Sequence, residues 1–594
     1  MTLPRKASPF NAGPALAILC LATLAAFWPV LHNGFVNWDD GANIQDNLSY
    51  RGLGWTQLKW MWTTFHMGHY QPLSWISLGL DYLAWGMDPF GYHLTNVLLH
   101  MINAVLFYFV ALRLLRAGMS GPSATEGTRP GHGALFAALI FALHPLRVES
   151  VAWATERRDV LSGAFYLAAI LFYLKAGAPA GLKARLRCLR AALLCCLLSL
   201  LSKAIGVTLP IALLILDVYP LRRLPGDPRR WLAPQARAVL LEKTPFLLAS
   251  LPFGIIALLA QRHTGVIARF ASVGILARLA LSFFAAAFYL WKTLAPIHLL
   301  PLYARAPQFD VWARPFLASV GVVVALSAAF FKLRRRWPAG LAAWCYYLIT
   351  LLPVLGIVLC GIYRAADRYT YLPCLAWALI AGAAIQRALQ RSDGLRRTAL
   401  MLALIGMTAG LGVLTWRQCR IWHDSKTLWG YTLSLDSRCA PARNNLGTAL
   451  AREGSATEAI AEFRSALSID PDYAEAHNNL GTAWARQGRP AQAVAEYRQA
   501  LAIEPAYAMA RDNLGAVLLG EGKLAEALSE YRQALEINPN DARARNNLGL
   551  TLAAQGRTAE AISEYRQALR ISPNYAEAAA NLRRILSLTS DRAR

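Results

Sequence analysis

The stretch "NNLGTAL" at residues 444–450 is the first of four near-copies in the C-terminal part of the chain. It returns as "NNLGTAW" from residue 478, "DNLGAVL" from 512 and "NNLGLTL" from 546, and a partial copy, "ANLRRIL", begins at 580. The interval between full copies is 34 residues, a period typical of stacked helix pairs with small residues where the two helices cross. We therefore expect a helical superhelix over residues 441–594, with four full repeats and a terminal helix.

Small and apolar residues also recur within each copy, and their pattern is identified as that of the tetratricopeptide repeat. In the first copy they are Leu446, Gly447, Leu450, Ala459, Phe463, Ala466 and Pro471. The stretch 424–437 aligns one period earlier with the second half of a repeat. We therefore predict three parts: a membrane domain over 1–418, a half-repeat connector over 419–440, and the repeat domain over 441–594.

One polar position interrupts this apolar pattern in every copy. It holds Asn445, Asn479, Asn513 and Asn547, with Asn581 in the partial copy. A fixed period keeps these side chains on one face of successive inner helices, and an amide can hydrogen-bond a peptide backbone whatever its sequence. The row resembles the asparagine ladder of the O-GlcNAc transferase superhelix. Two interpretations stay open: the amides bind an acceptor polypeptide on the concave face, or they are packing residues.

The first 418 residues alternate long apolar runs with short connectors. The whole chain of 594 residues is 56% hydrophobic and 16% charged, with a mean hydropathy of +0.33. These values exclude an ordinary soluble protein and predict many membrane spans in an all-α bundle. We expect about eleven, near 14–31, 92–115, 133–144, 159–175, 189–219, 244–260, 272–295, 316–332, 339–360, 371–388 and 398–416. The number becomes twelve if "LSKAIG" (201–206) is a turn between two spans.

The formal charge of +25 is concentrated in the membrane part. Residues 441–594 contain 18 basic and 18 acidic groups, so the first 440 residues hold 42 basic and 17 acidic groups. Much of the excess lies in short connectors such as 332–336 and 390–397, which is typical of cytoplasmic loops and argues against a nucleic-acid partner. With Arg5, Lys6 and 390–397 inside, the repeats lie outside, on the periplasmic side of an inner membrane. The basic loop 221–230 fits this count poorly.

With that orientation, residues 32–94 form one long exterior loop, which begins with the acidic stretch "VNWDDGANI" (36–44). Asp39 and Asp40 there have two interpretations, a turn or helix cap and a catalytic base. The aromatic-rich stretch 53–65 of the same loop predicts a helix lying in the membrane interface. Loops of this length are usually functional or disordered, and this one is too rich in aromatic residues to be disordered.

Two further exterior stretches are rich in ionisable groups at the ends of apolar runs, "HPLRVESVAWATERRDVL" (144–161) and "YRAADRYTYLP" (363–373). Ionisable groups at a membrane boundary are expensive, which makes a functional site the default hypothesis. Arginine suits bidentate phosphate binding and aspartate suits removal of a hydroxyl proton. A lipid-linked phosphosugar substrate needs both.

The chain resembles the transmembrane and tetratricopeptide repeat-containing O-mannosyltransferases and, more broadly, the GT-C glycosyltransferases. The matching pieces are the Asp pair, the stretch 144–161, "LLSLLSKAIGVTLP" (197–210), "DRYTYLP" (367–373) and the repeats. The resemblance implies an inverting transfer of a mannose-like sugar from a polyprenyl-phosphate donor, with no metal and no other cofactor. Where relatives commonly have Ser-Lys-Glu, this chain has Ala204, so an acidic role at that position is in doubt.

Carried onto matching positions, the resemblance makes Asp39 or Asp40 the base and assigns the donor phosphate to a set of basic residues. That set is Arg157, Arg158, Arg368, Lys203 and His144. Structural alternatives stay open for several of them: His144 as the end of a span, Lys203 as a side chain reaching the interface, and Glu149 as a partner that neutralises the arginines.

Two other function classes are compatible with this architecture. The first is a non-enzymatic membrane scaffold whose repeats gather partners for envelope assembly, although an anchor needs only one or two spans. The second is a transporter or flippase, although the apolar segments carry few of the charges that would form an ion path.

Overall fold

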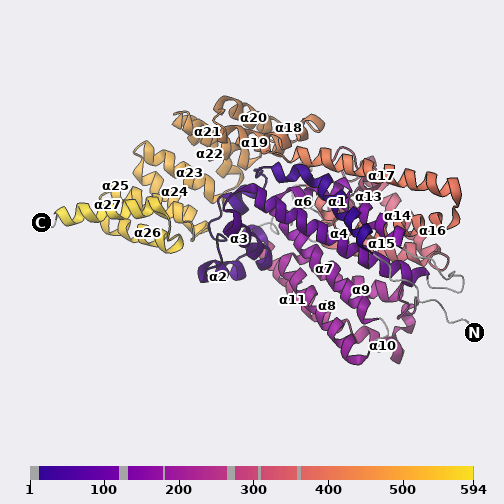
Figure 1. Cartoon of the computed structure of the whole chain (residues 1–594). Helices are drawn as coiled ribbons and strands as arrows, with labels where there is room; N and C mark the ends of the chain where they lie inside the picture. Colours follow the sequence, from indigo (N-terminus) through magenta and orange to yellow (C-terminus); the bar gives the residue numbers. More distant parts are fainter. Residues whose placement is uncertain are drawn as a thin grey trace, which may run out of the picture. The chain divides into compact units, whose positions relative to one another are not determined.

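The computed structural model describes residues 12–119, 131–177, 181–263, 274–304, 310–356 and 363–592. The described chain is almost entirely helical (Figure 1), which confirms the all-α prediction. It divides between Leu428 and Trp429 into two compact units, a membrane unit and a repeat unit. Arg5 and Lys6, on which the predicted orientation partly depends, lie outside the described residues.

The membrane unit contains sixteen labelled α-helices and one short pair of strands within the described ranges. The helices are α1 (Gly13–Phe27), α2 (Trp55–Thr63), α3 (Pro72–Trp85), α4 (Pro89–Met119), α5 (Gly131–Ala142), α6 (Val148–Ala152), α7 (Arg157–Ala176), α8 (Leu182–Ser202), α9 (Leu209–Val218), α10 (Pro234–Leu241), α11 (Thr244–His263), α13 (Ile275–Leu294), α14 (Arg314–Lys332), α15 (Pro338–Leu351), α16 (Leu375–Arg391) and α17 (Gly394–Ile421). Strands β1 (Tyr303–Ala304) and β2 (Tyr363–Ala365) pair antiparallel.

Seven helices among the described residues are long and apolar enough to cross a membrane. The number is eight if the bent pair Gly131–Ala142 and Pro145–Ala152 forms one span, and two shorter apolar helices cover Ala204–Val218 and Pro338–Val354. The chain is therefore a multi-pass membrane protein. Each of the eleven predicted spans contains a helix, and the doubtful one, 189–219, is broken between the end of α8 and the start of α9. The full count of about eleven stays a prediction.

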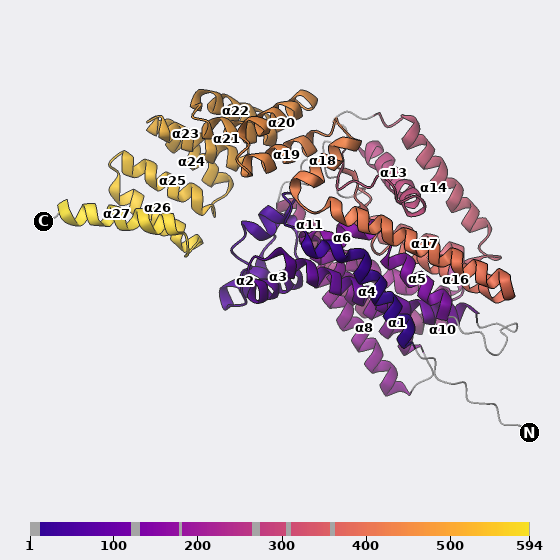
Figure 2. The ribbon, with the colours of Figure 1, turned by 45° about the horizontal axis from the view of Figure 1, so that its top comes forward.

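The centre of the membrane unit is built from α4, α5 and α7. Helix α7 packs along α8 and α4, α5 packs along α16, and α1 runs beside α17 (Figure 2). Small residues make the closest contact: a Cβ added at Gly382 of α16 would lie 2.4 Å from the backbone oxygen of Gly133 in α5. This packing brings the chain segments that follow α1, α5 and α8 to the same end of the bundle.

The long loop after α1 is folded rather than extended. Helices α2 and α3 enclose a small buried cluster made by Ile44, Tyr50, Met61, Trp75, Leu78 and Tyr92. The helix expected over 53–65 corresponds to α2, and its Trp55 is 81% exposed. A loop with its own core gives the acidic stretch 36–44 a fixed support.

The repeat unit is a row of antiparallel helix pairs that follows the predicted period. Its helices are α18 (Ser425–Leu435), which begins in the membrane unit, α19 (Ala440–Arg452), α20 (Ala456–Ile469), α21 (Ala474–Arg486), α22 (Pro490–Ile503), α23 (Ala508–Gly520), α24 (Leu524–Ile537), α25 (Ala542–Ala554), α26 (Thr558–Ile571) and α27 (Ala576–Arg592). Helix α18 occupies the predicted half-repeat 424–437.

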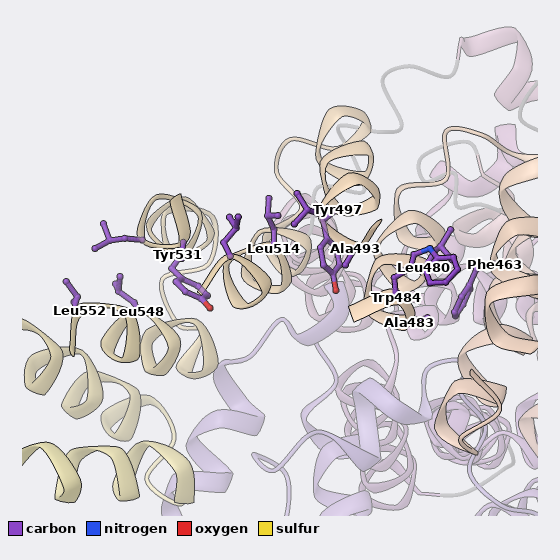
Figure 3. Packing of buried hydrophobic residues seen from close by; sticks show 14 of the residues in the cluster. Phe463, Leu480, Ala483, Trp484, Ala493, Tyr497, Leu514, Tyr531, Leu548 and Leu552 are labelled. Carbon is purple, nitrogen blue, oxygen red and sulfur yellow. The ribbon is translucent and has the colours of Figure 1, made fainter. Parts of the chain in front are cut away.

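The repeats share one continuous apolar core. Leu480, Trp484, Tyr497, Leu514 and Tyr531 follow one another along the row of helices (Figure 3). The regular spacing of glycine from repeat to repeat has a packing reason, because a Cβ added at Gly481 would lie 2.8 Å from the ring of Tyr497. The same clash recurs at Gly447, Gly515 and Gly549.

Candidate active site

Asp40 is the buried member of the acidic pair and holds the loop in place. Its Oδ1 accepts hydrogen bonds from the Thr155 backbone N–H (2.9 Å) and the Thr155 hydroxyl (2.7 Å), and its Oδ2 accepts one from the Val36 backbone N–H (3.0 Å). Burial raises the pKa of Asp40 to about 6, although these hydrogen bonds oppose the change. With both oxygens engaged, Asp40 fastens the loop to the segment that precedes α7.

Asp39 is the member of the pair whose carboxylate is available. It is half-buried, and its carboxylate forms no hydrogen bond or ion pair with any residue in the described ranges. Burial raises the pKa of Asp39, and the nearby guanidinium groups of Arg158 and Arg368 partly oppose that change. A carboxylate with a raised pKa and no partner has the properties of a general base.

Three basic side chains gather around the carboxylate of Glu156, which is completely buried. Arg158 Nη2 lies 2.5 Å from Glu156 Oε1, Lys203 Nζ lies 3.0 Å from Oε2, and Arg368 Nε lies 3.5 Å from Oε1. They come from the start of α7, the end of α8 and the segment after β2. We call Arg158, Lys203 and Arg368 the cation cluster.

Other carboxylates also contact the cation cluster. Lys203 Nζ lies 2.5 Å from Asp159 Oδ1, and Arg368 pairs with Glu149. The Glu149 pairing is the neutralising role considered from the sequence. Three carboxylates therefore balance the three cations, so the buried cluster avoids an uncompensated charge.

Some donors of the cation cluster stay unused. Arg158 uses Nε and Nη2 on Glu156, and its Nη1 makes no hydrogen bond within the part of the chain that the structure describes. Lys203 gives two of its three N–H groups to Glu156 and Asp159, and its side chain is 17% exposed. Arg368 lies over the ring of Trp153, with 5.3 Å from Cζ to the ring centroid. The remaining donors of Arg158 and Lys203 suit an incoming phosphate.

Arg157 and His144 do not join the cation cluster. Arg157 is fully buried and donates to Asn96, Ser77 and the Tyr92 carbonyl, and it forms an ion pair with Asp81 at 2.6 Å. All three of its guanidinium nitrogens are thus engaged in joining α3, α4 and α7.

Both ring nitrogens of His144 are also engaged. Its Nε2 lies 3.1 Å from the Thr293 carbonyl, and its Nδ1 accepts a hydrogen bond from the Leu146 backbone N–H at 3.3 Å. His144 therefore ends one helix and begins the next turn, the alternative that the sequence left open for it.

Sequence reasoning did not single out His69 and Glu156. His69 is half-buried, and burial together with the positive charges of Arg158 and Lys203 keeps its pKa well below its usual range, so it is neutral. The signal in the sequence for His69 is its place in the long loop after the first apolar run, and the structure adds that it follows Met67 and Gly68, both at positive φ. Glu156 precedes two arginines, and only the fold shows that it also meets Lys203.

The asparagine row of the repeats carries a second set of contacts. Four of these asparagines donate a side-chain hydrogen bond to the residue that stands 35 positions earlier, in the preceding repeat. The pairs are Asn479 to Asn444 (2.9 Å), Asn513 to Asn478 (2.9 Å), Asn547 to Asp512 (3.1 Å) and Asn581 to Asn546 (3.0 Å). Asn445 itself is buried. The row therefore links neighbouring repeats, and Asn479, Asn513 and Asn547 stay half-exposed.

Within the described ranges, no group of three or more His, Cys, Asp or Glu side chains is arranged to hold a metal ion.

Family models confirm the repeats. Models described as tetratricopeptide repeat match residues 513–576 and 474–507, and one described as TPR repeat matches 447–488. Among solved structures, the crystal structure of MamA protein is 25% identical and covers 26% of this chain and 84% of its own, with a TM-score of 0.23.

Several curated relatives bear the name expected from the sequence resemblance. Protein O-mannosyl-transferase Tmtc3 of Drosophila melanogaster is 30% identical over 227 residues, which is 35% of this chain and 24% of the relative. Protein O-mannosyl-transferase Tmtc1 of the same species is 41% identical over 106 residues, 18% of this chain and 11% of the relative. Human Protein O-mannosyl-transferase TMTC2 is 32% identical over 196 residues, 32% of this chain and 22% of the relative. The chain thus spans about a quarter or less of these relatives' lengths.

Proposed function

We propose that this protein is a membrane glycosyltransferase that moves a mannose-like sugar from a polyprenyl-phosphate donor to a hydroxyl group of a polypeptide. The observation that carries the proposal is the half-buried Asp39 carboxylate, which lies near the cation cluster and has no partner within the described residues. The site lies at the ends of apolar helices, where a lipid tail stays in the bilayer while its phosphate reaches the surface. The names of the curated relatives support the same class of reaction.

The proposed step is a direct displacement at the anomeric carbon of the sugar. The acceptor oxygen forms a bond to that carbon as the bond from the carbon to the phosphate oxygen breaks, which inverts the configuration. Asp39 takes the proton of the acceptor hydroxyl, and general-base help of this kind is typically worth about 10²–10⁴-fold. The leaving polyprenyl phosphate keeps the electron pair and is stabilised by Arg158, Lys203 and Arg368.

The repeats would bring the polypeptide acceptor. The half-exposed amides of Asn513 and Asn547 each have a second N–H that is not used in the link to the preceding repeat, and the second N–H of Asn479 makes only a long contact of 3.5 Å with the Thr448 hydroxyl. An unfolded acceptor segment presents backbone carbonyls that such a row can bind. We place this reaction on the periplasmic side of an inner membrane, because the basic connectors favour a cytoplasmic position for the opposite ends of the helices.

The direct test is release of polyprenyl phosphate from polyprenyl-phosphate mannose by the purified full chain in lipid nanodiscs. We expect release that increases when a library of Ser- and Thr-containing peptides is added, and mannose attached to those peptides by mass spectrometry. A scaffold or a flippase would leave the donor intact under the same conditions, and an intact donor would reject the proposal.

A further inference from the structure

The segment that leads from the last apolar helix into the repeats lies against the loop that carries Asp39. Three hydrogen bonds join them: Asn33 Nδ2 donates to the Cys419 carbonyl (3.1 Å), the Gly34 N–H to the His423 carbonyl (2.8 Å), and the Asn37 N–H to Ser425 Oγ (2.9 Å). The partners are almost 390 residues apart in the sequence, and all belong to the membrane unit. We call residues 419–425 the junction segment.

The junction segment also reaches the other half of the site. Trp422 is buried and stacks on Trp153, with 5.9 Å between ring centroids and 30° between ring planes. The guanidinium of Arg368 lies over the ring of the same Trp153. The junction segment therefore contacts both the loop that carries Asp39 and Trp153, the residue over which Arg368 of the proposed phosphate site lies.

Ser425 is the first residue of α18, the helix that opens the repeat series. Asp424 caps this helix, because its Oδ1 accepts a hydrogen bond from the Thr427 N–H at 2.8 Å. The start of α18 is therefore well defined, and the Ser425 hydroxyl holds the backbone two residues before Asp39. The helix that begins the repeats is in this way attached directly to the catalytic loop.

We propose that the junction segment is a positioning element for the Asp39 carboxylate, with Ser425 as its key side chain. The inference rests on the proposed function. Because the Asp39 carboxylate forms no hydrogen bond within the part of the chain that the structure describes, its place depends on the backbone of residues 33–40. Asp40 anchors one end of that stretch and the junction segment anchors the other. A catalytic group displaced by about 1 Å can lose about 10²-fold in rate.

The experiment compares Ser425→Ala with Ser425→Thr, which keeps the hydroxyl, and with Ser434→Ala as the matched control. Ser434 lies in the same helix and is exposed, and its hydroxyl donates a hydrogen bond to the Tyr431 carbonyl (2.7 Å). Release of polyprenyl phosphate from polyprenyl-phosphate mannose is measured across pH with each full-length protein in nanodiscs. Hydrogen exchange of residues 33–45 is measured on the same samples.

We expect Ser425→Ala to lower kcat about tenfold or more with the donor KM unchanged, and Ser425→Thr to restore it. Since burial raises the pKa of Asp39, a loosened loop exposes the carboxylate and lowers that pKa, so the acid limb of the pH–rate profile moves to lower pH. A merely structural loss would scale the whole profile and leave the acid limb where it was, which would overturn the proposal.

Hydrogen exchange separates this inference from the proposed function. Ser425→Ala should speed exchange in residues 33–45, and the Asn37 amide most of all, whether or not the protein transfers sugar. Unchanged exchange in that stretch would reject the positioning role by itself. Absence of donor turnover in the unmodified protein would instead reject the proposed function.

Discussion

The internal contacts that stabilise the repeat unit differ in kind from those that stabilise the site at the end of the membrane unit. In the repeats, the same residues return every 34 positions, and each helix pair packs on its immediate neighbours. In the site, Asp40 binds Thr155, and Glu156 pairs with one cation two residues away and with two cations from distant segments. A substitution in the repeats should therefore change stability with little effect on donor turnover, whereas a substitution in the cation cluster should change both donor turnover and stability.

Paired charges in the two regions show the same contrast. The same half-exposed ion pair recurs in successive repeats, for example between Arg511 and Glu530 at 2.8 Å. Pairs of this kind stabilise a fold only weakly. The cation cluster is buried, so its charges gain strength from the low dielectric but carry a large desolvation cost. A costly buried cluster beside an available carboxylate is an arrangement for function rather than for stability.

The largest effect is expected for Arg158→Gln, which removes the cation with a free Nη1. Removing one donor that stabilises a developing negative charge typically lowers kcat by about 10²–10³-fold. We expect such a loss in polyprenyl phosphate release measured well below the unfolding temperature, which should itself fall because two cations then face three buried carboxylates. Arg158→Lys is the control that keeps the charge, and it should retain part of the activity. Equal turnover in Arg158→Gln would remove this residue from the site.

The next effect is on stability in the repeats. Gly481→Ala forces a Cβ to within 2.8 Å of the Tyr497 ring and 3.2 Å of the Ala493 backbone oxygen. Overpacking of this kind typically costs about 1–3 kcal/mol. Gly520→Ala is the matched control, since a Cβ there meets no atom within 4 Å. Urea unfolding of fragment 424–594, followed by circular dichroism, should show a loss for Gly481→Ala alone.

A smaller effect is expected for the double change Asn479→Ala and Asn513→Ala. Each amide links its repeat to the preceding one, so the free energy of unfolding should fall by about 0.5–1.5 kcal/mol per lost hydrogen bond. Donor turnover should be unchanged, while binding of acceptor peptides weakens. Peptide binding that falls only as far as the folded fraction would reduce the asparagines to packing residues.

The smallest effect comes from the one repeat that carries histidine in place of arginine. A hydrogen bond from His477 to Glu496 (2.7 Å) raises the pKa of His477 above its ordinary value of 6.5. The stabilisation is therefore complete below about pH 6.5 and is lost as pH rises through the raised pKa. Because the pair is half-exposed, the change should be a few tenths of a kcal/mol. His477→Arg should abolish this pH dependence of the free energy of unfolding in urea. The other repeats already carry arginine at the equivalent position, as Arg443, Arg511 and Arg545.

The sequence predicted the repeats well because their information is local and repeated. A fixed period, the spacing of glycine and alanine, and the capping half-repeat all correspond to helices α18–α27. The apolar segments were predicted for the same reason, since the hydropathy of a segment depends only on the residues within it. The broken segment around Lys203 needed the fold, because a short turn and a continuous helix share one composition there.

The site was predicted in outline and not in its details. Arg157 and Arg158 are neighbours in the sequence, yet consecutive residues of a helix point about 100° apart, and only Arg158 faces Glu156. The choice between Asp39 and Asp40 depends on Thr155, which lies 115 residues further along the chain. No local pattern records a contact of that kind.

The central claim is that Asp39 is the general base and that Asp40 anchors the loop that carries it. The measurement that tests it compares Asp39→Asn with Asp40→Asn for donor binding, sugar transfer and thermal unfolding, all in the full chain. Asp39→Asn should bind polyprenyl-phosphate mannose and unfold normally, with transfer reduced about 10²–10⁴-fold. Asp40→Asn should lower the free energy of unfolding by about 1–3 kcal/mol, because the amide keeps one acceptor oxygen and its nitrogen cannot accept either the bond from Val36 or those from Thr155. Transfer by Asp39→Asn at the unmodified rate would contradict the account.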